Sequence, residues 1–241
     1  MSTYVMSDIH GVYEKYEEML KKIKFSSSDE MFVLGDVVDR GSGPIRVLDD
    51  IMERGNIHAL LGNHELMMYD ALTKDSWKMH RMWMENGGAV TECQFYELAG
   101  WERDSVIDYI FKLPIVIPEV DVNGIKYYLA HSACVKGDKT IGNLENDYNR
   151  IYEAVWSREY PLFSFPMSGL FQNMNNRILI TGHTMTWAYK DESPTKVKGH
   201  IFTDKEGCFI GIDCGCASYA YGNKKGRLGC LRLDDLKEFY I

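Results

Sequence analysis

The stretch "VLGDVVDRGSG", residues 33–43, places two aspartates and an arginine among glycines, directly after an apolar run. The apolar segment 31–34 predicts a short buried strand, so Asp36, Asp39 and Arg40 would lie at its carboxyl end. Such a cluster is either a polar turn or a site where carboxylates hold metal ions and a guanidinium holds a phosphate. The neighbouring sequence favours the second interpretation.

The first sixty residues alternate short apolar segments with amphipathic ones. Their periodicity, with Pro44 suited to open a helix and Gly55 to end one, predicts strands at 3–7, 31–34 and 57–61 and helices at 12–24 and 44–54. This order predicts parallel strands with helices on the faces of the sheet. The second half predicts further strands at 115–118, 125–131, 177–183, 200–203, 208–213 and 227–233. We therefore expect an α/β fold.

The length and composition suit one globular domain spanning residues 1–241, with a helical cap at about 65–112. A formal net charge of −8 argues against partners such as a nucleic-acid polymer or an anionic membrane, which require a surplus of Lys and Arg. The N-terminal sequence shows neither the basic region nor the apolar core of a signal peptide, so we expect a cytoplasmic protein. The six cysteines lack CxxC spacing and are expected to be reduced thiols.

Polar clusters follow five of the predicted strands: "SDIHG", "GDVVDRG", "GNHE", "HS" and "GHT". In open α/β sheets, ligands bind outside the carboxyl ends of the strands. Asp36 lies 26 residues beyond His10, and Asn63 lies 27 beyond Asp36, so each gap is about one strand–helix repeat. The clusters are therefore expected to form a single site. Alone, each has an ordinary explanation, since Asp-x-His is typical of a turn and "GNHE" of a capped helix start.

The residue types at these positions predict phosphoester chemistry. Carboxylate, imidazole and amide ligands without thiolate suit Mn most, with Fe or Zn possible. Asp36 is central enough to bridge two ions about 3.5–4 Å apart, which could share a hydroxide for in-line attack on phosphorus. Arg40 could bind the phosphate, and His64, oriented by Asp39, could protonate the leaving group. His58, His80 and His200 lie outside the clusters and are assigned no role.

These motifs resemble the signature of the calcineurin-like metallophosphoesterases, and in particular the phosphoprotein phosphatase branch with its compact bacterial and phage members. The resemblance runs from Asp8 to "GID" at 211–213. It implies a four-layer β-sandwich of mixed sheets flanked by helices. It also implies one metal held by Asp8, His10 and Asp36 and a second held by Asp36, Asn63, His131 and His183.

The resemblance implies further substrate contacts. Phosphate would contact Arg40, Asn63, His64 and a second arginine, Arg158, in "VWSREY" (155–160). The segment "MWMENGGAVT" (82–91) is similar to a Trp-x-x-Asn-Gly-Gly cap segment, which would pack helices and shape the pocket.

Three functions are compatible with these features. The first is a serine/threonine protein phosphatase, with tyrosine also possible, whose partner is a phosphorylated protein or peptide. The second is a symmetrical dinucleoside tetraphosphatase or another nucleotide-directed phosphoesterase. Enzymes of that kind tend to lack the second aspartate of "GDxxDRG", so the presence of Asp39 favours the first function. The third is a binding module without turnover, which the complete ligand set disfavours.

Overall fold

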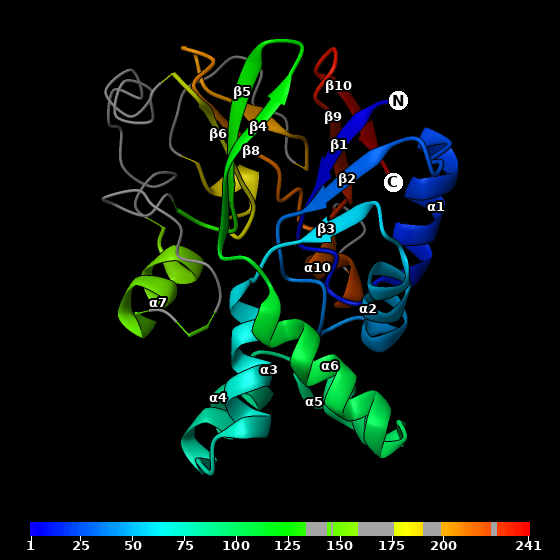
Figure 1. Ribbon diagram of the computed structural model, residues 1–241, viewed down its shortest axis with the longest axis vertical. Helices are drawn as coiled ribbons and strands as arrows, with labels where there is room; N and C mark the ends of the chain where they lie inside the picture. The colour runs from blue at the N-terminus through cyan, green and yellow to red at the C-terminus, as the bar shows by residue number, and fades with distance from the viewer. Residues whose placement is uncertain (134–143, 146, 159–175, 190–198, 223–225) are drawn as a thin grey trace.

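The protein is described by a computed structural model, which covers residues 1–133, 144–145, 147–158, 176–189, 199–222 and 226–241. Within these ranges two five-stranded sheets lie against each other (Figure 1). The first has the order β10 (Lys237–Tyr240), β9 (Gly229–Arg232), β1 (Thr3–Met6), β2 (Glu30–Val33) and β3 (Ile57–Ala59). The second has the order β4 (Val116–Val122), β5 (Ile125–Ala130), β6 (Ile178–Thr181), β8 (Phe209–Gly211) and β7 (Phe202–Thr203).

Each sheet has three parallel strands and antiparallel strands beside them. In the first sheet β1, β2 and β3 are parallel, and β9 and β10 extend the sheet in antiparallel pairing. In the second sheet β5, β6 and β8 are parallel, with β4 and β7 antiparallel at the edges. The prediction of an α/β fold with two mixed sheets flanked by helices is confirmed.

Alternation along the strands separates two hydrophobic cores. Val5 of β1, Leu129 of β5 and Ile180 of β6 are fully buried between the sheets. Their strand neighbours point the other way, because side chains alternate with a period of two residues. Tyr4 and Met6 accordingly belong to the larger core that the helices cover.

Helices α1 (Tyr13–Ile23) and α2 (Pro44–Glu53) cover the outer face of the first sheet (Figure 1). Pro44 opens α2 as predicted, because its fixed φ and missing N–H suit the first helical turn. Helix α1 is amphipathic and buries Tyr16, Met19 and Ile23. The loops that lead from β1 into α1 and from β2 into α2 lie side by side at the carboxyl ends of their strands.

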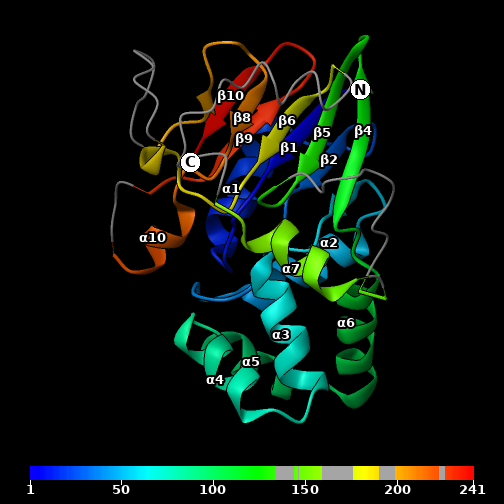
Figure 2. The ribbon, with the colours of Figure 1, turned by 90° about the vertical axis from the view of Figure 1, so that its left-hand side faces the viewer.

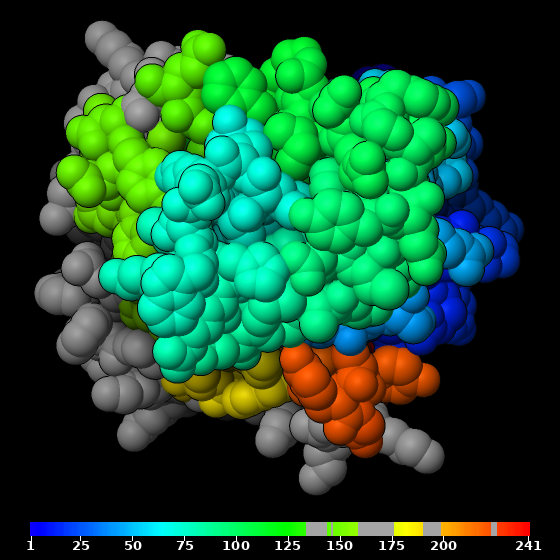
Figure 3. Space-filling model, turned by 90° about the horizontal axis from the view of Figure 1, so that it is seen from below, coloured from blue at the N-terminus to red at the C-terminus, as the bar shows by residue number. Residues whose placement is uncertain are grey.

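Four helices lie below the sheets in the view of Figure 1 and cover the lower end of the molecule, which Figure 3 shows. They are α3 (Asn63–Thr73), α4 (Trp77–Glu85), α5 (Ala89–Glu97) and α6 (Gly100–Lys112). Helix α7 (Tyr148–Trp156) packs beside α3 (Figure 2). The chain also forms a short 3-10 helix, η1 (Thr186–Ala188), and helix α10 (Cys216–Ala220). None of the helices in the described ranges combines the length and apolarity needed to span a bilayer.

The structure differs from the sequence prediction in several elements. Helix α7, helix α10 and strand β10 were not predicted, and the strands that lead to the polar clusters end one or two residues earlier than expected. At the carboxyl ends of these strands the backbone leaves the hydrogen-bonded pairing of the sheet early, because the following residues turn toward the polar clusters. Cys93, Cys208, Cys214, Cys216 and Cys230 are free thiols, and Cys134 lies outside the described residues.

Alanine substitution of two isoleucines in strands tests the core between the sheets, because the two variants should differ in their free energy of unfolding. Ile180→Ala removes a fully buried side chain and should lower the free energy of unfolding by about 2–5 kcal/mol. Ile125→Ala, at a position 44% exposed, should cost about 1 kcal/mol or less. Urea unfolding of both variants measures the difference, and equal losses would contradict the assigned core.

Candidate active site

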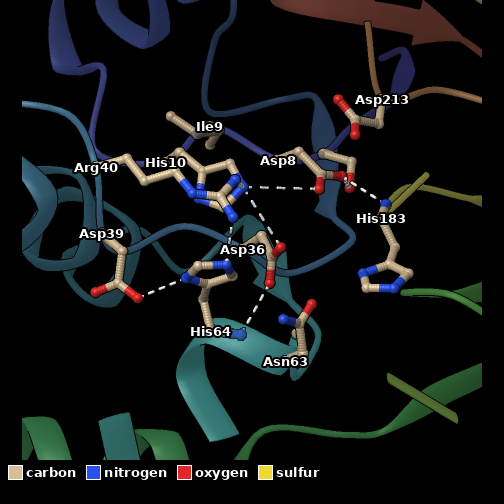
Figure 4. A network of polar contacts seen from close by, with 12 residues as sticks. Asp8, Ile9, His10, Asp36, Asp39, Arg40, Asn63, His64, His183 and Asp213 are labelled. Carbon is tan, nitrogen blue, oxygen red and sulfur yellow. Dashed lines mark hydrogen bonds and ion pairs between the residues drawn. The ribbon is translucent and has the colours of Figure 1, made fainter. Parts of the chain in front are cut away.

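The polar clusters meet at the carboxyl ends of parallel strands from both sheets (Figure 4). Between the loops after β1 and β2, backbone hydrogen bonds continue past the strands, from His10 N–H to the Asp36 carbonyl and from Asp8 N–H to the Gly35 carbonyl, at 2.9 and 3.1 Å. The second sheet contributes His131 after β5 and His183 after β6. The structure therefore brings together the residues that the sequence predicted as ligands: Asp8, His10, Asp36, Asn63, His131 and His183.

Many of these residues adopt a left-handed backbone conformation that L side chains rarely use. Positive φ angles occur at Asp8 (52°), His10 (48°), Asp36 (53°), Asp39 (72°), Arg40 (70°) and His183 (60°). Each such residue costs of order 1–2 kcal/mol. Strain of this kind persists only where the surrounding contacts determine the conformation, and it concentrates here at one site.

The carboxylate of Glu65 is one of those contacts. It is fully buried and accepts hydrogen bonds from the N–H groups of Gly62 and Asp36 through Oε2 (2.9 and 2.8 Å) and of Val37 and Val38 through Oε1 (2.7 and 3.2 Å). Burial, and then the charge of Asp36, raises the pKa of Glu65 to about 7. The side chain thus caps α3 and shapes the loop that carries Asp36.

The contacts of His131 test whether a cation suits this site. Its Nδ1 lies 2.6 Å from the Leu34 carbonyl, which can only accept, so Nδ1 carries the proton and Nε2 of the neutral ring does not. That Nε2 faces the Oδ1 atom of Asn63 at 3.0 Å and Oδ1 of Asp36 at 3.4 Å. Three lone-pair donors converging without a proton between them fit a metal ion.

His10 and Asp8 lie on the other side of Asp36. The Nε2 atom of His10 lies 3.5 Å from Oδ2 of Asp36 and 3.9 Å from Oδ1 of Asp8. His183 Nε2 is buried and makes no hydrogen bond with the described atoms, while its backbone N–H donates to Oδ2 of Asp8 at 2.9 Å. Two groups of donor atoms share Asp36: one contains His10, Asp36 and His64, and the other contains Asp36, His131 and His183. Asp36 is thus placed as a bridging carboxylate would be, and Asp8 lies beside the first group.

The charges of the site also fit bound cations. Burial lowers the pKa values of His10, His131 and His183, which keeps these rings neutral and able to donate lone pairs. Burial, and then the charges of Asp213 and Asp36, raises the pKa of Asp8 well above its usual range. Buried carboxyl groups this close together need positive charge to stay ionised. Two divalent ions would supply it.

Arg40 lies between two imidazoles. Its Nη1 and Nη2 atoms donate to Nε2 of His10 and of His64, at 2.8 and 2.9 Å. Because a guanidinium has donors only, both Nε2 atoms accept, and the ring protons are on Nδ1. His64 Nδ1 donates to Oδ2 of Asp39 at 2.5 Å (Figure 4).

The predicted cap segment contacts both Asp39 and Arg40. The indole N–H of Trp83 lies 3.0 Å from each carboxylate oxygen of Asp39, and Thr91 donates to Oδ1 at 2.6 Å. The backbone N–H of Arg40 donates to the Gly87 carbonyl at 3.1 Å. A Cβ atom at Gly87 would lie 2.9 Å from Cγ of Arg40, so glycine lets the cap approach the arginine closely. The segment therefore holds the Asp39–His64 pair and Arg40 in place.

Arg158 lies two residues beyond the end of α7. Its Nη1 donates to the His183 carbonyl and to Oγ1 of Thr184, at 3.2 and 3.0 Å, and the residue is exposed. Arg158 and Arg40 line the same pocket as Asp36. The predicted second arginine is thus brought to the site.

Sequence reasoning missed other residues of the site. Glu65 was quoted within "GNHE" without a role, although its position at the third residue of a helix is a capping signal. Asp213 lies buried in the pocket after β8, where its pKa is raised to about 6 by burial and by Asp36. Its position after a predicted strand was the available signal. Ser7, which donates to Asp8 at 2.5 Å, gave none.

The contacts of Glu65 predict a structural role. Glu65→Gln should lower the free energy of unfolding by about 1–3 kcal/mol, because an amide NH₂ cannot accept from the backbone N–H groups that now face a carboxylate. Affinity for Mn²⁺, measured by calorimetry, should fall with it. The control is Glu102→Gln, at a surface capping glutamate bonded to Ala99 N–H at 2.7 Å, which should cost about 0.5 kcal/mol or less. Equal effects in the two variants would contradict the role assigned to Glu65.

Comparison with known proteins identifies relatives in both sequence and structure. The chain is 38% identical over 176 residues to a symmetrical bis(5'-nucleosyl)-tetraphosphatase of Erwinia tasmaniensis, covering 72% of this chain and 59% of that protein. A protein of the same name from Haemophilus ducreyi is 36% identical over 74 residues, which are 30% of this chain and 27% of the relative. The chain thus spans less than two thirds of the length of these curated relatives.

Solved structures share the fold at low sequence identity. A serine/threonine phosphatase of Saccharomyces cerevisiae aligns with a TM-score of 0.63 and 17% identity, over 100% of this chain and 79% of that chain. A cold-active protein-tyrosine phosphatase of a Shewanella species gives 0.59 and 16%, over 99% and 80%. At such identities these similarities show the fold alone.

The expected partner, a phosphorylated protein or peptide, is wrong. The curated relatives are named for bis(5'-nucleosyl) tetraphosphates, which are nucleotides and not phosphoproteins. The presence of Asp39 was the basis of that expectation. In the structure Asp39 is fully buried, bonded to His64, Trp83 and Thr91, and not among the residues that line the pocket, so it orients its neighbours.

The family model for calcineurin-like phosphoesterases matches residues 1–187, well over half of the chain. With the two-sheet fold and the carboxylate–imidazole site already in place, this match establishes that the chain belongs to the calcineurin-like phosphoesterase family.

Proposed function

We propose that this chain is a metal-dependent hydrolase of dinucleoside polyphosphates that splits a tetraphosphate symmetrically into two nucleoside diphosphates. The observation that carries this proposal is the pair of arginines, Arg40 and Arg158, in one pocket with the Asp36 cluster. A chain of four phosphates carries more negative charge than one phosphate ester and benefits from several separate cations. The names of the curated relatives support the same substrate.

Two divalent ions, Mn²⁺ by preference and Fe or Zn as alternatives, would be held in two groups around Asp36. Carboxylate, imidazole and amide donors without thiolate suit these ions. When bound, the ions would acidify water and neutralise charge on the phosphate oxygens. The proposed ligands are Asp8, His10 and Asp36 for one ion, and Asp36, Asn63, His131 and His183 for the other.

The chain's own side chains would bind the substrate and move the proton. Arg40 and Arg158 bind phosphate oxygens, with Asn63 and His64 beside them. When a phosphate takes over the donors of Arg40, Nε2 of His64 is released, can take up a proton from solvent to form the imidazolium, and can then give that proton to the leaving oxygen. Asp39 accepts from Nδ1 and stabilises the imidazolium, so His64 acts as the general acid.

The substrate prediction is tested by product analysis. The Mn²⁺-loaded protein should convert diadenosine tetraphosphate into ADP as the sole nucleotide product, measured by ion-exchange chromatography. Asp36→Asn is the matched control and should abolish turnover, because it removes the shared carboxylate. Formation of AMP with ATP, or no cleavage while an aryl phosphate is hydrolysed, would rule out the proposal.

A second prediction separates acid catalysis from metal binding. His64→Asn should lower the turnover number by about 10²–10⁴-fold while both ions stay bound, since His64 is proposed as acid and not as ligand. Metal content by mass spectrometry is the deciding measurement, with His131→Asn as the comparison that should lose metal. Parallel loss of metal and activity in His64→Asn would make His64 a ligand instead.

A further inference from the structure

Trp156, the last residue of α7, lines the pocket beside the candidate metal ligands. Its ring centroid lies 6.2 Å from that of His183, with the two rings nearly perpendicular at 82°. The indole is partly exposed. Trp83, in contrast, is fully buried, and its indole N–H donates to the carboxylate of Asp39. Trp156 therefore contributes an aromatic ring to the lining of the pocket.

The ring of Trp156 is supported from behind. Tyr152 lies one helical turn earlier and stacks on it, with centroids 5.6 Å apart and planes 24° apart. Side chains four residues apart lie over each other on a helix, so this stack is a local property of α7. Because Tyr152 holds one side of the indole, little rotamer entropy remains to be lost when a ligand stacks on the ring.

Arg158, a proposed phosphate-binding residue, lies two residues beyond Trp156. Arg158 is fixed by Thr184 and the His183 carbonyl, and it remains exposed in the same pocket. An aromatic plane next to a fixed guanidinium matches the two halves of a nucleotide, which are a flat base and a charged phosphate. A phosphate ester without a base could use only the arginine.

We propose that Trp156 is a specificity-determining residue that stacks on one nucleobase of the substrate, with Tyr152 supporting its ring. This inference rests on the proposed function, since it names the group that distinguishes a nucleotide from other phosphate compounds. Trp187 also lines the pocket. A Cβ atom at Gly215 would lie 2.0 Å from its Cη2 atom, so that end of the ring lies against backbone and is less open to a base.

The test compares two ligands that differ only in the base. AMP and ribose 5-phosphate are measured as competitive inhibitors of aryl phosphate hydrolysis by the Mn²⁺-loaded protein, because an inhibition constant does not depend on the KM of the reporter. The wild type should bind AMP about 10-fold or more tightly than ribose 5-phosphate, as expected for one stacked base. Trp156→Leu should bring that ratio close to one with the inhibition constant of ribose 5-phosphate unchanged.

Three further variants sharpen the result. Trp156→Tyr keeps an aromatic plane and should retain most of the preference for AMP. Tyr152→Leu should weaken the preference by a few-fold, and Trp101→Leu, at a tryptophan 71% exposed on α6, should leave it unchanged. An unaltered ratio in Trp156→Leu, equal weakening of both ligands, or a loss confined to Trp187→Leu would each overturn the assignment.

The two proposals fail separately. If the wild type hydrolyses the aryl phosphate but not diadenosine tetraphosphate, the proposed function is wrong, while the AMP ratio still reports on base stacking. If the tetraphosphate is cleaved and the ratio does not respond to Trp156→Leu, the stacking assignment is wrong and the proposed function stands.

Discussion

Two hydrogen bonds between the sheets hold the site together. The His183 N–H donates to Oδ2 of Asp8, and Nδ1 of His131 donates to the Leu34 carbonyl, at 2.9 and 2.6 Å. They join segments 175 and 97 residues apart. Neither sheet carries a complete ligand set, because Asp36 needs imidazoles from both. The interface between the sheets is therefore a condition for the proposed metal site as well as for the core.

A cluster of buried acidic groups at the site destabilises the folded protein unless cations neutralise their charge. Asp8, Asp36 and Asp213 lie together with neutral imidazoles, and the backbone at several of these positions is left-handed. The four N–H groups that converge on Glu65 hold part of this strained backbone in place. Stability and metal binding are thus linked here, since bound ions stabilise the folded state in proportion to their concentration and affinity.

The helices below the sheets contact the proposed catalytic residues and contribute one of the proposed ligands, Asn63 at the start of α3. Trp83 and Thr91 orient Asp39, and the Gly87 carbonyl holds the backbone of Arg40. Helix α7 adds the second arginine from another direction. The pocket therefore lies between the strand-end loops and residues at the ends of helices from different parts of the chain.

The sequence by itself determined the parallel strands, helices α1 and α2, and the ligand candidates, because strand and helix periodicity and polar strand ends are local features. It did not reveal α7, the contacts of Glu65 and Asp213, or the burial of Asp39 behind His64, Trp83 and Thr91. Those features depend on contacts between residues far apart in the chain, which no local pattern encodes. Only the packing of the two sheets and the cap decided which side chains meet in the pocket and which are buried behind it and hold a neighbour in position.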